Sequence, residues 1–229
     1  MMMKTMLTAM AALMVSGCIS ILPDAPPAPY TYTMRAGEVT PAGVAAKPLV
    51  ISVGAPTMQR MAAGADIVWR TGPEVAVMEG VAWDDSAPDL LQLMLAETLD
   101  RGGGFRAALR SGSGARGDLD VRWDVLAFEV VEDGGLEAVF SANVRLIDAR
   151  SRAVLETRRV ETRTPIASRS GRLATAALEK AAQDACLQIA VWAAEKAPTP
   201  STPPVVSNQP TSADQPAAPP QPSAASTRR

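Results

Sequence analysis

The chain contains no histidine among its 229 residues. Histidine is the side chain that titrates near neutral pH and the commonest metal ligand, so its absence excludes Ser/His/Asp and Cys/His catalysis as well as histidine-based metal sites. Cysteine is scarce too, since only Cys18 and Cys186 occur. Cys18 belongs to a leader motif described below, which leaves Cys186 without a disulfide partner. The fold therefore has to be held by its core alone.

Blocks of like charge are also missing. The chain carries 22 Lys and Arg against 24 Asp and Glu, a formal net charge of −2, and the two signs alternate along the sequence. A basic block is typical of proteins that bind nucleic acid or an anionic bilayer surface. We therefore expect no nucleic acid partner.

Recognisable catalytic motifs are absent as well. Without histidine, an enzyme would need a convergent carboxylate pair or a Ser/Lys arrangement. The pair Asp84-Asp85 directly precedes a predicted helix, where acidic side chains favour the positive end of the helix dipole. The Gly/Ser turn at residues 111–114 lacks the Lys-Ser/Thr ending of a phosphate-binding loop. We expect no enzyme, no metal and no cofactor, and a hydrolase is the weakest hypothesis.

The sequence does contain a leader. One lysine precedes an apolar run over residues 6–15, which is too short for a membrane-spanning helix of roughly 20 residues and is typical of a secretory signal peptide. The run ends in Val15-Ser16-Gly17-Cys18, which resembles the bacterial lipobox. The resemblance implies that a signal peptidase recognises Val15, Ser16 and Gly17. It also implies that Cys18 receives a diacylglycerol and an N-acyl chain.

Acylation at Cys18 would anchor the chain stably, because two or more acyl chains hold a domain on a bilayer where one chain does not. Ile19 follows the cysteine, in place of the Asp that retains such lipoproteins at the inner membrane. The outer membrane of a Gram-negative envelope is therefore favoured, with the domain facing the periplasm. We divide the chain into a signal peptide (1–17), a Pro-rich tether (18–29), one domain (30–196) and a disordered Pro/Ala/Ser-rich tail (197–229).

Hydrophobic periodicity predicts the elements of the domain. An edge strand is predicted at residues 30–33 and a stronger strand at 49–53. The stronger strand is expected to pair antiparallel with a hairpin formed by residues 67–70 and 74–81. The later elements are a helix from Ser86 to Gly102, a short strand at 105–109, a meander over 119–131, 136–148 and 154–164, and a closing helix over 170–195.

These elements predict an α+β fold, in which a mixed, mostly antiparallel sheet packs against two helices in a single domain. The last strand of the meander carries charges at alternating and adjacent positions, which suits either an edge protected by charge or a face that meets a partner. Cys186 lies beside the apolar stripe of the closing helix without a basic neighbour. It is therefore expected to be a small buried apolar residue.

The order of these features resembles the ABC-type transport auxiliary lipoprotein family, whose members accompany ABC transporters and MCE-domain lipid-trafficking systems. The resemblance spans residues 30–195. It rests on the lipobox and the Tyr-rich opening, and on Leu49–Val53, Ile67-Val68-Trp69-Arg70, Trp83, the Leu-rich helix that begins near Pro88, and a closing helix that ends in Trp192.

The resemblance implies a non-catalytic envelope lipoprotein that assists an ABC transporter or MCE-type system in moving lipids or hydrophobic solutes between membranes. Its expected partners are an MCE-domain protein, the ABC permease and ATPase, and the membrane reached through the lipid anchor, while homo-oligomerisation stays open. A small tethered domain cannot span the periplasm, so we expect it to dock through a sheet edge or the loop at 54–65. The candidate partner-binding residues are Met58, Met61, Trp69, Arg70 and Trp83.

Two alternatives stay open at this point. Met58 and Met61 are also explained as loop residues that fold back onto the core, because methionine fills irregular apolar gaps. The chain as a whole also fits an outer-membrane assembly or secretion lipoprotein, whose small α+β domain would resemble secretin pilots or the amino-terminal domain of Tol-Pal translocation proteins.

Overall fold

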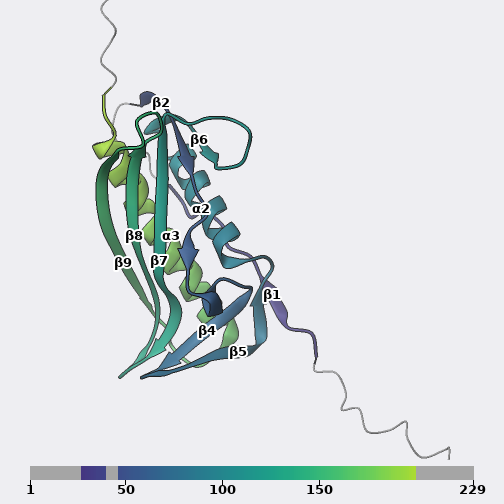
Figure 1. Cartoon of the computed structure of the whole chain (residues 1–229). Coiled ribbons are helices and arrows are strands. Elements are labelled where there is room, and N and C mark those ends of the chain that lie inside the picture. The colour runs from purple at the N-terminus through teal and green to yellow at the C-terminus, as the bar shows by residue number, and fades with distance from the viewer. Residues whose placement is uncertain (1–26, 40–45, 200–229) are drawn as a thin grey trace, which may run out of the picture. The chain divides into compact units, whose positions relative to one another are not determined.

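A computed structural model describes residues 27–39 and 46–199. The segments expected to be a signal peptide with a lipobox at Cys18, most of the expected tether, and the expected tail from residue 200 onward lie outside the described residues. Within these ranges, nine strands form one mixed sheet and two long helices pack against it (Figure 1). The expected α+β fold, with a mixed sheet and two helices in one domain, is confirmed.

The described elements follow the chain in an order close to the one that the periodicity predicts. They are β1 (Tyr30–Tyr32), β2 (Lys47–Val53), β3 (Thr57–Met58), the 3₁₀ turn η1 (Arg60–Ala62), β4 (Asp66–Thr71), β5 (Glu74–Trp83), α2 (Ala87–Arg101), β6 (Phe105–Arg110), β7 (Leu119–Glu132), β8 (Leu136–Asp148), β9 (Val154–Pro165) and α3 (Gly171–Lys196).

Strand β7 is the central strand of the sheet. Along one edge it pairs antiparallel with β8 over its whole length, and β8 pairs antiparallel with β9. Along the opposite edge it receives three short strands in parallel, β2 at its start, β3 near its middle and β4 near its end. The sheet extends from β2 to β6 and from β4 through β5 to β1.

The pairing expected for residues 49–53 is wrong. Strand β2 pairs in parallel with β6 and β7, and it does not pair with the hairpin of β4 and β5. The hairpin itself is confirmed, with Gly72 at a φ of +55° in its turn. The segment expected as a loop at 54–65 contains β3 and η1. Hydrophobic periodicity identifies a strand and its buried face, but it does not identify which strand, distant in the sequence, will pair with it.

The two helices begin and pack as their sequences dictate. Ser86 is the N-cap of α2, where its hydroxyl accepts a hydrogen bond from the Asp89 N–H at 3.3 Å. Helix α3 faces the sheet with small side chains, and Ala181, Ala182 and Ala185 are fully buried. Cys186 lies in the same buried stripe, as expected, and burial raises the pKa of its thiol. Neither described helix is both long and apolar enough to cross a bilayer.

Aromatic side chains fill the core between the sheet and the helices. The rings of Trp123 and Phe128 each approach Phe140, with centroids 6.3 and 6.0 Å apart. The indole N–H of Trp123 donates to the Gly54 carbonyl at 2.8 Å, which ties the end of β2 to β7. The opposite face of the sheet carries no α-helix among the described residues (Figure 1), and that face holds the candidate site.

Candidate partner-binding surface

The strands along the open edge of β7 leave a gap. Met58 of β3 lies opposite Val125, and the next paired position is Val130, opposite Trp69 of β4. Residues 126–129 therefore have no strand partner on that edge within the described chain. A bulge between Val125 and Ala127 falls in the same gap. The interruption leaves a depression in the surface of the sheet.

An apolar groove of about 140 Å³ occupies this gap. Its apolar walls include Met58, Met61, Ala62, Val68, Val75 and Leu126. Exposure is high for large apolar side chains, at 45% for Met61, 45% for Val75 and 38% for Leu126. Val77 extends the surface, because it lies directly across from Val68 and is 40% exposed. We call Met61, Val75, Val77 and Leu126 the apolar patch.

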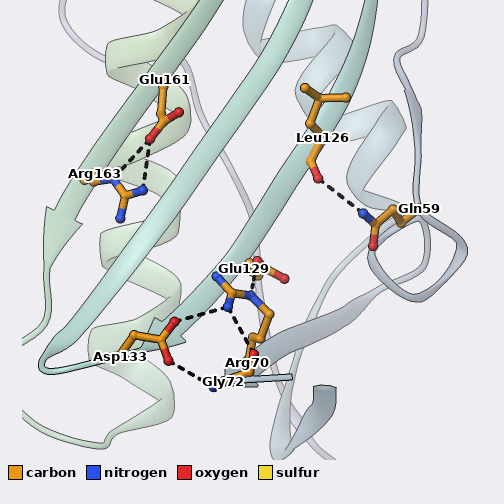
Figure 2. A network of polar contacts seen from close by, with 8 residues as sticks. All are labelled: Gln59, Arg70, Gly72, Leu126, Glu129, Asp133, Glu161 and Arg163. Atoms are coloured by element: carbon orange, nitrogen blue, oxygen red, sulfur yellow. Dashed lines mark hydrogen bonds and ion pairs between the residues drawn. The ribbon is translucent and has the colours of Figure 1, made fainter. Parts of the chain in front are cut away.

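One side chain replaces the missing strand at the base of the groove. The amide of Gln59 donates to the Leu126 carbonyl at 3.4 Å, as Figure 2 shows. The segment that carries Gln59 is held at β3, where the Thr57 hydroxyl donates to the Asp124 carboxylate at 2.5 Å. The groove is thus formed by backbone that is already fixed, so a partner would meet a largely preformed surface.

A charged cluster borders the groove at the β4 end. The Arg70 guanidinium donates to Glu129 at 2.8 Å and to Asp133 at 3.2 Å, while Asp133 also accepts the Gly72 N–H at 3.0 Å (Figure 2). The hydrogen bond to Glu129 is the main cause that raises the pKa of Arg70. The cluster fixes the β4–β5 turn against the β7–β8 turn.

The Trp69 side chain lies on the other face of the sheet, where it also forms polar contacts. Its indole N–H donates to the Glu132 carboxylate at 3.3 Å, and the Arg169 guanidinium carbon lies 5.1 Å from its ring centroid. Arg169 also pairs with Glu132, and this pairing is the main cause that lowers the pKa of the Glu132 carboxyl. The contacts join the start of α3 to the sheet.

The five predicted residues thus fall in three different environments. Met58 packs partly buried against the core, as the fold-back explanation expects, whereas Met61 is exposed on the groove wall and its contact with a partner stays a prediction. Arg70 belongs to the charged cluster beside the groove, and Trp69 belongs to polar contacts on the other face of the sheet. The prediction that Trp83 binds a partner is wrong. Its side chain is 2% exposed and its ring stacks on Phe128 with the centroids 5.9 Å apart, so the ring is not available to a partner.

Sequence reasoning missed three members of the apolar patch, namely Val75, Val77 and Leu126. The sequence does contain a signal for the exposure of Leu126. Buried apolar residues alternate at odd positions from Leu119 to Val125 and resume at even positions with Phe128 and Val130. Such a change of phase indicates a bulge.

A second depression, of about 840 Å³, lies at the start of β7. Its carboxylates all serve local structure: Asp118 accepts the Val50 N–H, Asp148 accepts the Ser151 N–H, and Asp120 pairs with Arg152 at 3.5 Å. Across the described residues no group of three or more acidic or cysteine side chains is placed to hold a metal ion. The depression therefore has the character of a polar surface hollow.

Comparison with known proteins identifies the family. The model of the ABC-type transport auxiliary lipoprotein component matches residues 30–190. The structure of XCC0632 from Xanthomonas campestris, of family DUF330, is 22% identical with a TM-score of 0.67, covering 73% of this chain and 96% of that one. A second structure, of an uncharacterized protein, is 14% identical with a TM-score of 0.53, covering 69% of this chain and 97% of that one. These likenesses establish the fold.

No curated protein matches the chain. The family match covers most of the chain and includes every element from β1 to nearly the end of α3. The chain therefore belongs to the family of ABC-type transport auxiliary lipoprotein components.

Proposed function

We propose that this chain is a non-catalytic lipoprotein, anchored through Cys18, that docks on an ABC transporter or MCE-type system moving lipids or hydrophobic solutes across the Gram-negative envelope. The observation that carries the proposal is the family match over residues 30–190. The exposed apolar patch supports it, because scattered single apolar residues are normal on a surface, whereas a group beside a groove is typical of interaction sites.

The cavities of the domain favour docking over carrying a cargo. Pockets that enclose small molecules typically measure roughly 300–1,000 Å³ and are mostly apolar. In the described part of the chain, the apolar groove measures about 140 Å³ and the larger depression is lined mainly by polar groups. Neither encloses the acyl chains of a lipid. The contribution of this domain is then to position a partner, which is the role expected of an auxiliary component.

The proposed anchor limits where that docking takes place. An extended chain covers about 3.5 Å per residue, so the tether at residues 18–29 reaches at most roughly 40 Å. The folded domain would stay within that distance of the bilayer. We favour the outer membrane, because Ile19 follows the cysteine. The partner must then extend to the periplasmic surface of that membrane.

Co-purification from crosslinked cells of the native host tests the proposal. The full chain with a C-terminal affinity tag should recover an MCE-domain protein or an ABC permease or ATPase. Recovery of none of these components would contradict the transport role.

Labelling with a clickable fatty acid tests the anchor separately. Wild-type protein should take up the label and Cys18→Ala should not. Label that survives in Cys18→Ala would contradict the proposed anchor while leaving the transport role in place.

A further inference from the structure

Within the described residues, no strand covers the outer edges of β1, β6 and β9 or the first part of β5, and two of these edges run for seven residues or more. One is the outer edge of β9, which carries the charged residues Glu156, Arg158, Arg159, Glu161 and Arg163. Charged side chains along an edge are a common protection against pairing with another chain. The other is β5 from Glu74 to Gly80, because β1 pairs with β5 only from Val81 onward. Between its end residues, this second edge presents Val75, Ala76, Val77 and Met78 and lacks such protection until Glu79.

The prolines before β1 explain why the chain itself leaves this edge open. Tyr30 lies opposite Val81 in parallel register. Continuing that register backward would place Pro29 beside Gly80 and Pro27 beside Met78. Proline has no N–H to donate to a ladder, so β1 cannot extend along β5 in this direction. The edge from Glu74 to Gly80 is consequently exposed, with only Met78 partly buried.

The open edge is continuous with the apolar patch. Val75 and Val77 lie on the face that also carries Val68, the residue directly opposite Val77. Val75 itself lines the groove together with Met61 and Leu126. A strand added to β5 would therefore place every second side chain over apolar surface that is 40–45% exposed at Val77 and Val75. Backbone hydrogen bonds and apolar contacts would form together.

The charges at this edge define the partner further. Glu74 and Glu79 are exposed at its two ends, and neither forms an ion pair with another described residue. A partner segment with Lys or Arg near its ends would complement both. Electrostatic complementarity of this kind sets the choice of partner more than the affinity.

We propose that β5 from Glu74 to Gly80 is a strand-addition site for an extended segment of a partner protein. The segment carries apolar side chains at alternate positions over Val75 and Val77 and basic residues near its ends. That the partner is a transporter component rests on the proposed function above, whereas the site itself rests on the edge, the apolar patch and the two glutamates. Strand addition derives affinity from the backbone and specificity from the alternate side chains.

Hydrogen exchange with a defined peptide tests this site. The probe is the acetylated and amidated peptide Lys-Val-Thr-Val-Thr-Val-Lys, and the control is the same peptide with its backbone amides N-methylated, which removes its donors. Added to the full-length chain, the probe should slow amide exchange in residues 74–80 and not in β9. The methylated peptide should have no effect.

Two variants sharpen the test. Val77→Lys should weaken peptide binding roughly tenfold, because it removes apolar contact from the centre of the site. Val154→Lys is the matched control, since Val154 is 53% exposed on β9, and it should bind the peptide like the wild type. Circular dichroism of both variants should show an unchanged fold.

Two results would overturn the proposal: no protection of β5 at millimolar peptide, or equal protection of β5 and β9. These outcomes are independent of the co-purification experiment. Recovery of a transporter component together with an unprotected β5 would overturn the site and leave the function. Protection of β5 without recovery of such a component would do the reverse.

Discussion

Replacing Trp83 with alanine tests whether this residue serves the core or a partner surface. Its side chain is 2% exposed, and its ring lies 5.9 Å from that of Phe128 with the planes at 17°. Truncating a buried tryptophan costs about 3–5 kcal/mol, of which the stacking supplies a minor part. Each kcal/mol lowers the Tm of a domain of this size by about 2–4 °C, so Trp83→Ala should lower the Tm by roughly 6–20 °C.

Urea unfolding followed by circular dichroism measures this loss of stability. Trp83→Phe is the control, because it keeps an aromatic ring against Phe128 and should lose only about 1–2 kcal/mol. The reasoning would be refuted if Trp83→Ala unfolded within about 0.5 kcal/mol of the wild type and yet lost its crosslinked partners. That combination would mean that the tryptophan ring meets a partner and contributes little to the core.

Three further predictions concern other parts of the fold. A β-carbon at Gly171 would lie 2.4 Å from a valine methyl group on β5, so Gly171→Ala should destabilise the domain by about 1–3 kcal/mol in urea, whereas Gly135→Ala, with open space around it, should be neutral. The pKa of Asp124 is lowered, chiefly by the Thr57 hydroxyl, so its stabilisation is present above its unfolded pKa and is lost as the pH falls through the lower folded value. The stability difference between wild type and Asp124→Asn should therefore shrink below pH 3.8, and a constant difference would contradict this. Burial and the raised pKa should keep Cys186 from reacting with a thiol reagent until the domain unfolds, and fast labelling of the native protein would contradict that placement.

The local elements could be predicted because their signals are local. Ser86 and Pro88 mark the start of α2, and strict alternation marks β7 and β8. The position of β2 in the sheet could not be predicted, because its parallel partners lie about 50 to 70 residues away and nothing in its own pattern selects among them. The two-residue strand β3 is also too short to produce a period.

The candidate site was predictable where single residues have a distinctive character. Met61 is a flexible apolar residue in a segment of mostly small side chains, and it is exposed. Trp83 was assigned wrongly because a tryptophan beside a helix start has the same sequence signature whether its ring faces inward or outward. The groove could not be predicted, because it depends on the distance between β3 and β4 along β7. That gap exists only because both short strands pair with the same edge of β7.

The groove and the open edge of β5 offer different kinds of interaction. In the groove, Gln59 already satisfies the Leu126 carbonyl that a neighbouring strand would otherwise engage, so a partner there gains mainly apolar contact. Along β5, every second residue of 74–80 directs its backbone N–H and C=O away from β4, toward an edge without a described strand neighbour, so a partner gains hydrogen bonds that almost any sequence can form. Affinity would then come chiefly from the edge and discrimination from the patch. Because Val75 belongs to both surfaces, Val75→Lys should weaken binding at the groove and at the edge together, whereas Val77→Lys should weaken binding at the edge alone and Leu126→Lys at the groove alone.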